Sequence, residues 1–387
     1  MRRLSYIDAL RGYAILMVIA VHTSQAFSDL PKPLSTILNQ GARGVQLFFV
    51  TSALTLSMSW VGRKEGALAF YSRRFFRIAP MFWLAIPFFV WLNGTGSSLY
   101  APDGIGIRHI AMTAMFVHGF WPDTITSVVP GGWSVADEVI FYALFPVMVP
   151  ALLQASWRSL ITVMVVAVVL GAQVSRLLDG FSNILPTSAQ GVAGEYFSLW
   201  FPRQLPCFIF GVALFKFSAE QHRISESLAK CVCALAVALM FTFPFLDGIK
   251  YVLPLGLATS YGIAFSLFAF SLMYWRTSPL ISNPIVWIGK VSYSAYFVHF
   301  AVLHYLPPLR PTGLPSINFA IMYAAVIIST VSISSITYLF VEMPMIGLGS
   351  RLIESRRSLP IQPAEASCAR QHERPGSRRA NCRRSIL

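Results

Sequence analysis

Residues 7–27, IDALRGYAILMVIAVHTSQAF, are the stretch of sequence that decides the fold of this chain. A transmembrane α-helix needs about 20 predominantly apolar residues, and this stretch has that length. It nevertheless contains an aspartate, an arginine and a histidine, which are costly in lipid unless they face other protein or a polar cavity. The stretch therefore predicts a membrane-spanning helix with one face turned into a helix bundle.

The three ionisable residues of this stretch fall on one face of the predicted helix. Asp8 and Arg11 are three positions apart, which suits an ion pair within the helix. His22 follows Arg11 by eleven positions, about three turns plus 20°, so it lies on the same stripe about 16 Å further along the axis. We interpret this stripe as a candidate functional site. The alternative is that Arg11 reaches the membrane interface and that His22 hydrogen-bonds inside the bundle.

The composition of the whole chain extends the prediction. Of its 387 residues, 55% are hydrophobic and 12% are charged, and the mean hydropathy is +0.61. Such a chain has more apolar surface than a soluble domain needs, and it lacks the alternating strands of a membrane barrel. The formal net charge of +14 lies in loops and in the tail, where it favours contact with anionic lipid rather than nucleic acid. We therefore predict an all-α, polytopic transmembrane helix bundle.

Ten apolar runs are predicted to be spanning helices. They are residues 7–27, 44–61, 80–92, 135–153, 160–175, 204–217, 228–246, 252–274, 291–306 and 317–341. A further apolar run, residues 107–120, is too short to span comfortably and contains Arg108, His109 and His118. We expect a re-entrant or interfacial segment there.

The distribution of positive charge predicts the orientation and the domain organisation. Basic residues cluster before the first run, between the second and third, and after the last, which places both termini in the cytoplasm. Residues 1–346 form the predicted membrane domain, and residues 347–387 form a basic, polar tail. Because the tail has no apolar period, we expect it to be disordered, and we expect no appended soluble domain.

A basic run, residues 71–80 (YSRRFFRIAP), precedes the third predicted span. If the run is helical, Arg74 and Arg77 share a face. Two neighbouring guanidinium groups can then clamp a phosphate, with Arg73 beside them. The alternative is that the cluster only marks the cytoplasmic side of the membrane.

The segment GGWSVADE, residues 131–138, precedes the fourth predicted span. Ser134 and Asp137 fit a helix N-cap and its acidic partner three positions later, which gives Asp137 a structural role. Glu138 has no such role and is a candidate for positioning a substrate hydroxyl or for tuning a histidine. His299, in the ninth predicted span, is of a kind that more often makes a hydrogen bond within a bundle than acts as a catalyst. Because the histidines and cysteines show no metal-binding spacing, we predict no metal.

Taken in order, these motifs resemble those of the acyltransferase-3 family of integral-membrane acyltransferases. The matching segments are IDALRG (7–12) with His22, GVQLFFV (44–50), RRFFRIAP (73–80), WS (133–134) with EVIFY (138–142), GKVSYS (289–294) with His299, and VEMP (341–344). The resemblance implies a ten-helix bundle in the bacterial inner membrane. It also implies transfer of an acyl group, usually acetyl, from acyl-coenzyme A to a hydroxyl of a lipid-linked or exported surface carbohydrate.

The resemblance implies a role for five residues. They are the arginine–histidine pair of the family, Arg11 and His22, its Arg-x-x-Arg motif, Arg74 and Arg77, and its acid, Glu138. The second span departs from a common pattern of the family, because Gln46 stands in place of an aspartate and Ala53 in place of the glycine after Ser52. That departure leaves the role of this span open.

We hypothesise O-acyl transfer from acetyl-coenzyme A to a carbohydrate hydroxyl, in a cavity that contains the whole stripe. His22 would be the general base or a transient acyl carrier. Arg11, oriented by Asp8, would hold the donor or stabilise negative charge, and Arg74 and Arg77 would bind the phosphates of the coenzyme. The alternative is a transporter or exporter of a polysaccharide or glycolipid, with Arg11 and His22 along its path.

Overall fold

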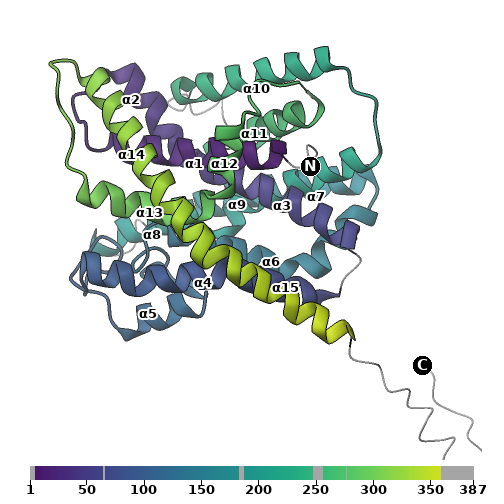
Figure 1. Cartoon of the computed structure of the whole chain (residues 1–387), viewed down its shortest axis with the longest axis horizontal. Coiled ribbons are helices and arrows are strands. Elements are labelled where there is room, and N and C mark those ends of the chain that lie inside the picture. The colour runs from purple at the N-terminus through teal and green to yellow at the C-terminus, as the bar shows by residue number, and fades with distance from the viewer. Residues whose placement is uncertain (1–4, 64–65, 183–186, 247–255, 276, 359–387) are drawn as a thin grey trace, which may run out of the picture.

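The computed structural model describes residues 5–63, 66–182, 187–246, 256–275 and 277–358. All regular structure within these ranges is helical, which confirms the all-α prediction (Figure 1). The elements are α1 (Ser5–Ser24), α2 (Lys32–Asn39), η2 (Gln40–Arg43), α3 (Gly44–Arg63), α4 (Ala67–Asn93), α5 (Ile107–Ala114), η3 (His118–Phe120), α6 (Gly132–Gln154), α7 (Trp157–Ser182), α8 (Thr187–Leu199), α9 (Phe201–Ala219), α10 (Glu226–Leu246), α11 (Leu257–Tyr274), α12 (Asn283–Lys290), α13 (Ser292–Tyr305), α14 (Pro315–Thr337), η4 (Tyr338–Glu342) and α15 (Met343–Ser358).

The described helices make the chain a multi-pass membrane protein. Eight helical stretches are long and apolar enough to cross a membrane, and α12 with α13, bent by 81°, makes a ninth if the pair is one span. Each of the ten predicted spans falls on one of these stretches or on α7, whose apolar part, Trp157–Gln173, is shorter. The first residues of the predicted span 252–274 lie outside the described residues.

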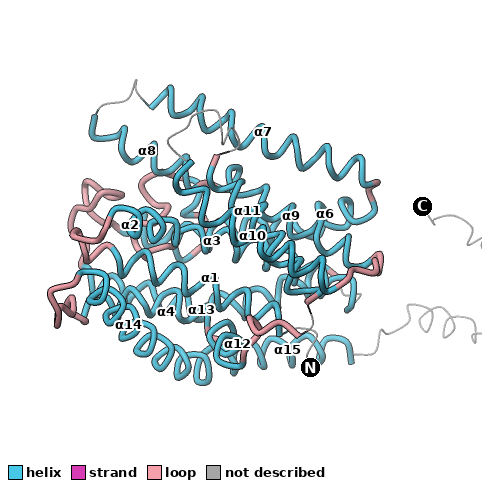
Figure 2. The backbone as a smooth tube through the Cα atoms, turned by 90° about the horizontal axis from the view of Figure 1, so that it is seen from above, coloured by secondary structure: helices cyan, strands magenta, loops and turns pink. Residues whose placement is uncertain are grey.

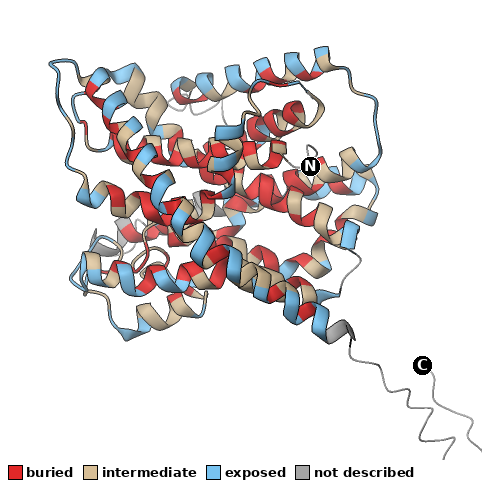
Figure 3. Ribbon diagram, viewed as in Figure 1, coloured by how far each residue is buried: buried red, intermediate tan, exposed pale blue. Residues whose placement is uncertain are grey.

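Helix α1 lies in the middle of the bundle. It packs against α3, α12, α13 and α14, and several of its side chains, such as Leu10, Ile15 and Ile19, are fully buried. The ribbon through the centre of the molecule is coloured mostly as buried (Figure 3). Helices α14 and α15, joined by the π-helical turn η4, run as one diagonal across one side of the molecule, and α7 lies along the opposite side (Figures 1 and 2). The stretch that was expected to decide the fold is therefore its centre.

Two glycines set the spacing between α1 and α12. A Cβ atom on Gly12 would lie 2.4 Å from the carbonyl oxygen of Ile285, and one on Gly289 would lie 1.7 Å from that of Asp8. Real Cβ atoms do not approach backbone oxygens this closely, because the atoms overlap. Only glycine therefore allows the two helices to touch through their backbones.

Helices α4 and α15 extend beyond the predicted spans. Helix α4 begins at Ala67 rather than at residue 80, so the basic run 71–80 is helical. Helix α15 continues to Ser358, so residues 347–358 of the predicted tail are helical. There Ile353 is buried, and a Cβ on Gly349 would lie 2.8 Å from Phe76 of α4. Packing against α4 holds this polar sequence in a helix, and residues 359–387 lie outside the described residues.

The segment between α4 and α6 contains the short helix α5, whose eight residues cannot span a membrane. His118 of this segment is 1% exposed, and its Nε2 atom lies 3.0 Å from the carbonyl oxygen of Gly132. Its ring stacks on Phe82. Burial lowers the pKa of His118 to about 4, although the hydrogen bond to Gly132 acts in the opposite direction.

The glycine contact predicts that Gly289→Ala destabilises the bundle. The added methyl group has to push α1 and α12 apart, which we expect to lower the free energy of unfolding by about 1–3 kcal/mol. Thermal unfolding of the purified protein in detergent measures the change. Gly62→Ala is the matched control, since a Cβ there meets nothing within 4 Å. A Gly289→Ala variant as stable as the Gly62→Ala variant would contradict the close contact.

The buried ring of His118 predicts a loss of stability in mild acid. The folded-state pKa of about 4 lies below the ordinary value of 6.5, so between these pH values only the unfolded chain binds the proton. We expect this residue to lower the free energy of unfolding by about 2 kcal/mol between pH 7.5 and pH 5. Denaturant titrations at both pH values give the difference. His118→Gln, which keeps a donor for the Gly132 carbonyl, should remove that part of the pH dependence, and an unchanged dependence speaks against the assignment.

Candidate active site

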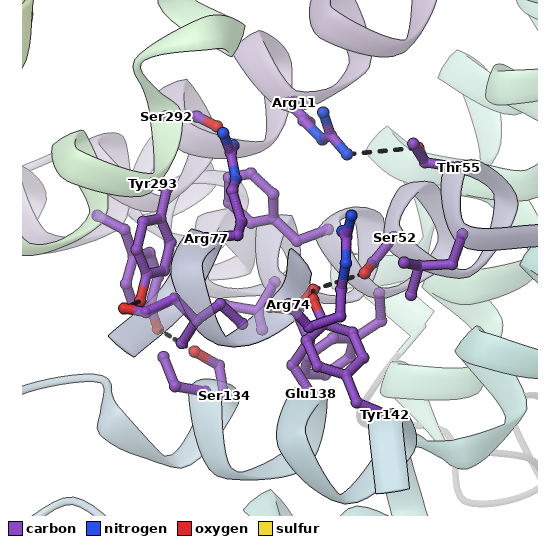
Figure 4. Close-up of a pocket in the computed structure, with 17 residues that line it drawn as sticks. Arg11, Ser52, Thr55, Arg74, Arg77, Ser134, Glu138, Tyr142, Ser292 and Tyr293 are labelled. Atoms are coloured by element: carbon purple, nitrogen blue, oxygen red, sulfur yellow. Dashed lines mark hydrogen bonds between the residues drawn. The ribbon is translucent and has the colours of Figure 1, made fainter. Parts of the chain in front are cut away.

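A polar pocket with a cavity volume of about 90 Å³ lies inside the bundle (Figure 4). It is formed by α1, α3, α4, α6 and α13. Its polar lining consists of Arg11, Ser52, Thr55, Arg74, Arg77, Ser134, Glu138, Tyr142, Ser292, Tyr293 and Tyr296. The structure thus brings together four residues that the sequence singled out, Arg11, Arg74, Arg77 and Glu138. The volume suffices for a few water molecules or a group of the size of acetyl.

Three guanidinium groups face this pocket, one from α1 and two from α4. Arg11 forms the predicted ion pair, with its Nη1 atom 3.7 Å from Oδ1 of Asp8, and its Nη2 atom donates to Oγ1 of Thr55 at 3.3 Å. Arg74 and Arg77 share one face of α4 because the basic run is helical. Three positive charges around a small volume make a site suited to a polyanion.

Glu342, in the π-helical turn η4, ties α4 to the start of α13. Its Oε2 atom lies 3.6 Å from Nη1 of Arg77, and its Oε1 atom accepts hydrogen bonds from the backbone N–H of Ser294, at 3.1 Å, and from the Ser294 hydroxyl. Glu342 is 2% exposed. A buried carboxylate of this kind fixes the Arg77 side chain and orients it towards the pocket.

Glu138 is the carboxylate of the pocket itself. Its Oε1 atom accepts hydrogen bonds from the hydroxyls of Ser52 and Tyr142, both at 2.5 Å. The Arg74 guanidinium lies beside Glu138 and Tyr142 (Figure 4). The second span therefore contributes to the site through Ser52 and Thr55.

The expected cap of α6 is wrong. Gly131, with φ 72°, is the N-cap, and the helix begins at Gly132. Glycine adopts this left-handed conformation without strain, so the helix starts before Ser134 is reached. The Ser134 hydroxyl donates to the Gly131 carbonyl at 3.0 Å. Asp137 is 1% exposed, and its Oδ2 atom has no hydrogen-bond partner among the described residues, so the capping role does not explain it.

His22 does not line the arginine pocket, contrary to the expectation of one cavity for the whole stripe. It lies about three turns further along α1, where its ring faces α13. The ring centroids of His22 and His299 are 5.3 Å apart, and that of Phe300 is 4.7 Å from His22. Nδ1 of His22 lies 3.3 Å from Oε1 of Gln25. The sequence could not show that α13 places a second histidine here.

Tyr296 lies between the arginine pocket and the histidine pair. Its side chain lines the pocket, and its ring centroid is 6.0 Å from that of His299. Its hydroxyl donates to the Gly131 carbonyl at 3.1 Å and lies 3.0 Å from the Ser134 hydroxyl. One residue thus contacts both parts of the candidate site.

Several residues around the site were not singled out by sequence reasoning. They are Ser52, Thr55, Tyr142, Ser292, Tyr293 and Tyr296. Tyr142 could have been found from the sequence, because it follows Glu138 by four positions and so shares a face of the same helix. Arg73 lines a smaller neighbouring cleft with Arg63 and Trp60 instead of the pocket.

The unusual Gln46 has a structural partner. It is 2% exposed, and its Nε2 atom donates to Oε1 of Gln204 on α9 at 2.8 Å. One hydrogen bond joins the two amides across the bundle without a charge, where an aspartate would need a proton or a cation. Oε1 of Gln46 has no hydrogen-bond partner among the described residues. The departure at this position therefore lies outside the pocket lining. The described residues include no group of three or more His, Cys, Asp or Glu side chains that could hold a metal ion.

Comparison with known proteins gives this geometry a context. A protein of Staphylococcus aureus (strain MRSA252) with the provisional name of an O-acetyltransferase is 24% identical over 392 residues, which covers 92% of this chain and 60% of that protein. The O-acetyltransferase OatA of Staphylococcus aureus (strain NCTC 8325 / PS 47) is 25% identical over 377 residues, or 89% of this chain and 57% of OatA. This chain thus spans no more than about 60% of the length of these relatives. No solved structure matches it.

A family model described as an acyltransferase domain matches residues 4–339. The match includes α1, α3, α4, α6 and α13, which are all the helices that line the pocket. It covers most of the 387 residues. The chain therefore belongs to the acyltransferase-3 family.

Proposed function

We propose that this chain is a membrane-bound O-acyltransferase that moves an acetyl group from acetyl-coenzyme A to a hydroxyl of a cell-surface or exported carbohydrate. The observation that carries the proposal is the convergence of Arg11, Arg74 and Arg77 on one pocket inside the bundle. Membership of the family supports acyl transfer as the reaction class. The name of OatA supports acetyl as the group and oxygen as the receiving atom.

The arginines recognise the donor by its charge. Coenzyme A carries a diphosphate and a ribose phosphate, and guanidinium groups bind phosphate oxygens with paired N–H donors. Arg74 is best placed for this, because its Nε atom is buried and has no hydrogen-bond partner among the described residues. Arg77 lies one turn along the same face and is held by Glu342, and Arg73 adds charge in the neighbouring cleft.

Glu138 and Arg11 act on the part of the donor inside the pocket. Glu138 holds the hydroxyls of Ser52 and Tyr142 in the pocket wall, so these groups are oriented before the donor binds. Arg11 is oriented by Asp8. It adds a third guanidinium that holds the phosphates of the donor in this pocket.

His22 is the proposed general base, or a transient carrier of the acyl group. A neutral imidazole can remove the proton from a hydroxyl and give it to the departing thiolate. Since His22 lies apart from the arginines, the phosphates and the thioester of the donor occupy different parts of the site. The extended pantetheine arm of coenzyme A separates the same two groups in the donor.

The arrangement in the membrane follows from charge. The distribution of positive residues supports cytoplasmic termini in a bacterium, and the same side for the basic run that contains Arg74 and Arg77. The donor then enters from the cytoplasm, and the inner membrane is the proposed location. A lipid-linked or exported glycan reaches the site from the membrane or from the opposite face.

Loss of the Arg74 guanidinium should weaken donor binding. We expect Arg74→Ala to raise the KM for acetyl-coenzyme A by about 10- to 100-fold, because a charge-assisted hydrogen bond to phosphate contributes about 1.5–3 kcal/mol. Steady-state kinetics of the purified protein with varied donor measure the effect. Arg158→Ala is the matched control, because Arg158 is exposed near the start of α7. An unchanged KM in Arg74→Ala would remove Arg74 from donor binding.

Loss of the His22 imidazole should abolish carbohydrate acylation. We expect His22→Ala to insert normally but to leave the surface polysaccharide without its acyl groups, since the proposed base is lost. Mass spectrometry of polysaccharide from cells with each variant gives the number of acyl groups per repeat. His304→Ala, at an exposed position of α13, is the control. Full acylation with His22→Ala rules out this role, and loss of export with no use of acetyl-coenzyme A favours the transporter alternative.

A further inference from the structure

Two histidines from opposite ends of the sequence meet inside the bundle. The rings of His22 and His299 have centroids 5.3 Å apart and planes inclined by 35°. Phe300 packs on both, with its centroid 4.7 Å from that of His22 and 4.0 Å from that of His299. The prior expectation for His299 was a lone histidine with a hydrogen bond inside the bundle. It has such a bond, but it also has His22 as a neighbour.

The hydrogen bonds of His299 determine which nitrogen carries its hydrogen. Nδ1 lies 3.0 Å from the carbonyl oxygen of Ala295, one turn earlier in α13. A carbonyl oxygen only accepts, so Nδ1 is the donor and Nε2 holds the lone pair. His299 is fully buried, and its Nε2 atom has no hydrogen-bond partner among the described residues. A buried acceptor without a donor is destabilising, so a neighbouring N–H that donates to this nitrogen would remove that cost.

His22 can bring that group. Its Nδ1 atom is 3.3 Å from Oε1 of Gln25 and donates to this oxygen, which leaves the lone pair on Nε2 as the base. When Nε2 of His22 takes up a proton, the ring gains a second N–H. At a centroid distance of 5.3 Å, a modest rotation of the ring brings a nitrogen of each imidazole within hydrogen-bonding reach of the other.

We propose that His299 is a positioning residue for His22, which accepts a hydrogen bond from the N–H that His22 gains during catalysis. This inference rests on the proposed acyl transfer. The acceptor hydroxyl gives its proton to Nε2 of His22, and its oxygen forms the new bond to the acyl carbon. The carbon–sulfur bond of the thioester breaks, and the sulfur leaves as a thiolate. While it carries the proton, His22 is held between Gln25 and His299, and it then gives the proton to the thiolate.

A packing role alone does not account for His299. Phenylalanine would fill the same space between Tyr296 and Phe300 without a buried acceptor that has no donor. A histidine here is costly in the resting state and is compensated only when a neighbour gains an N–H. His22 is the imidazole beside it that the proposed reaction protonates.

Three substitutions at one position separate the hydrogen bond from packing. In His299→Phe the ring remains and the acceptor is lost. The oxygen of His299→Gln reaches the position of Nε2, whereas the shorter side chain of His299→Asn places its oxygen near the position of Nδ1. The assay is steady-state transfer by the purified full chain in detergent with acetyl-coenzyme A as donor. His304→Phe, on the same helix but exposed, is the control for a lost histidine.

We expect kcat to fall by about 10- to 100-fold in His299→Phe and His299→Asn, with the KM for acetyl-coenzyme A unchanged. His299→Gln should stay within about threefold of the unmodified chain. Equal activity of all three variants would overturn the inference, and so would an equal loss in all three, because only the acceptor distinguishes them. Thermal unfolding of each variant shows whether it has folded. If the unmodified chain transfers no acetyl group, the proposed function itself fails, whereas a normal His299→Phe beside an inactive His22→Ala refutes only the role of His299.

Discussion

A charge inside a membrane protein has to be matched within the bundle, because lipid offers no water to solvate it. In this chain one match lies within α1, and the others join segments that are far apart in the sequence. Asp8 lies beside Arg11 within α1, Glu342 joins η4 to α4 and α13, and Glu138 joins α6 to α3. The contacts involve all five helices that line the pocket. The same groups that make the site polar therefore also fix the positions of the helices that form it.

Local sequence patterns predicted the elements well because each apolar run has to satisfy its own backbone hydrogen bonds as a helix. The ends of the helices depend on contacts that no local pattern contains. Helix α15 runs into the polar tail because Gly349 lets it lie directly on Phe76. Helix α6 begins early because Gly131 takes a left-handed conformation. In both cases the role of a glycine depends on its surroundings in the fold, which a local pattern does not contain.

The candidate site, too, could be predicted only where local helical spacing determines it. The pairing of Asp8 with Arg11 and the shared face of Arg74 and Arg77 follow from helical spacing alone. The helical stripe also puts Arg11 and His22 on one side of α1, but it cannot show which helices cover each end. Helix α13 covers the His22 end with His299 and Phe300. The Arg11 end lines the polar pocket, so the two ends of the stripe have different surroundings. The sequence marked Glu342 only as a residue at the end of a predicted span and did not predict its pairing with Arg77.

The central position of α1 has a consequence for the choice of donor. Arg11 and His22 belong to one continuous, buried helix, so the distance between them is fixed at about 16 Å by the helical rise and does not change when neighbouring helices move. Helix α1 thus sets a constant spacing between the two backbone positions. If phosphates are bound at one end and the thioester reacts at the other, donors are selected by the length of the arm between these groups. A truncated thioester without its nucleotide would lose its anchor, and a longer acyl chain would extend beyond the histidine end and leave the spacing unaltered.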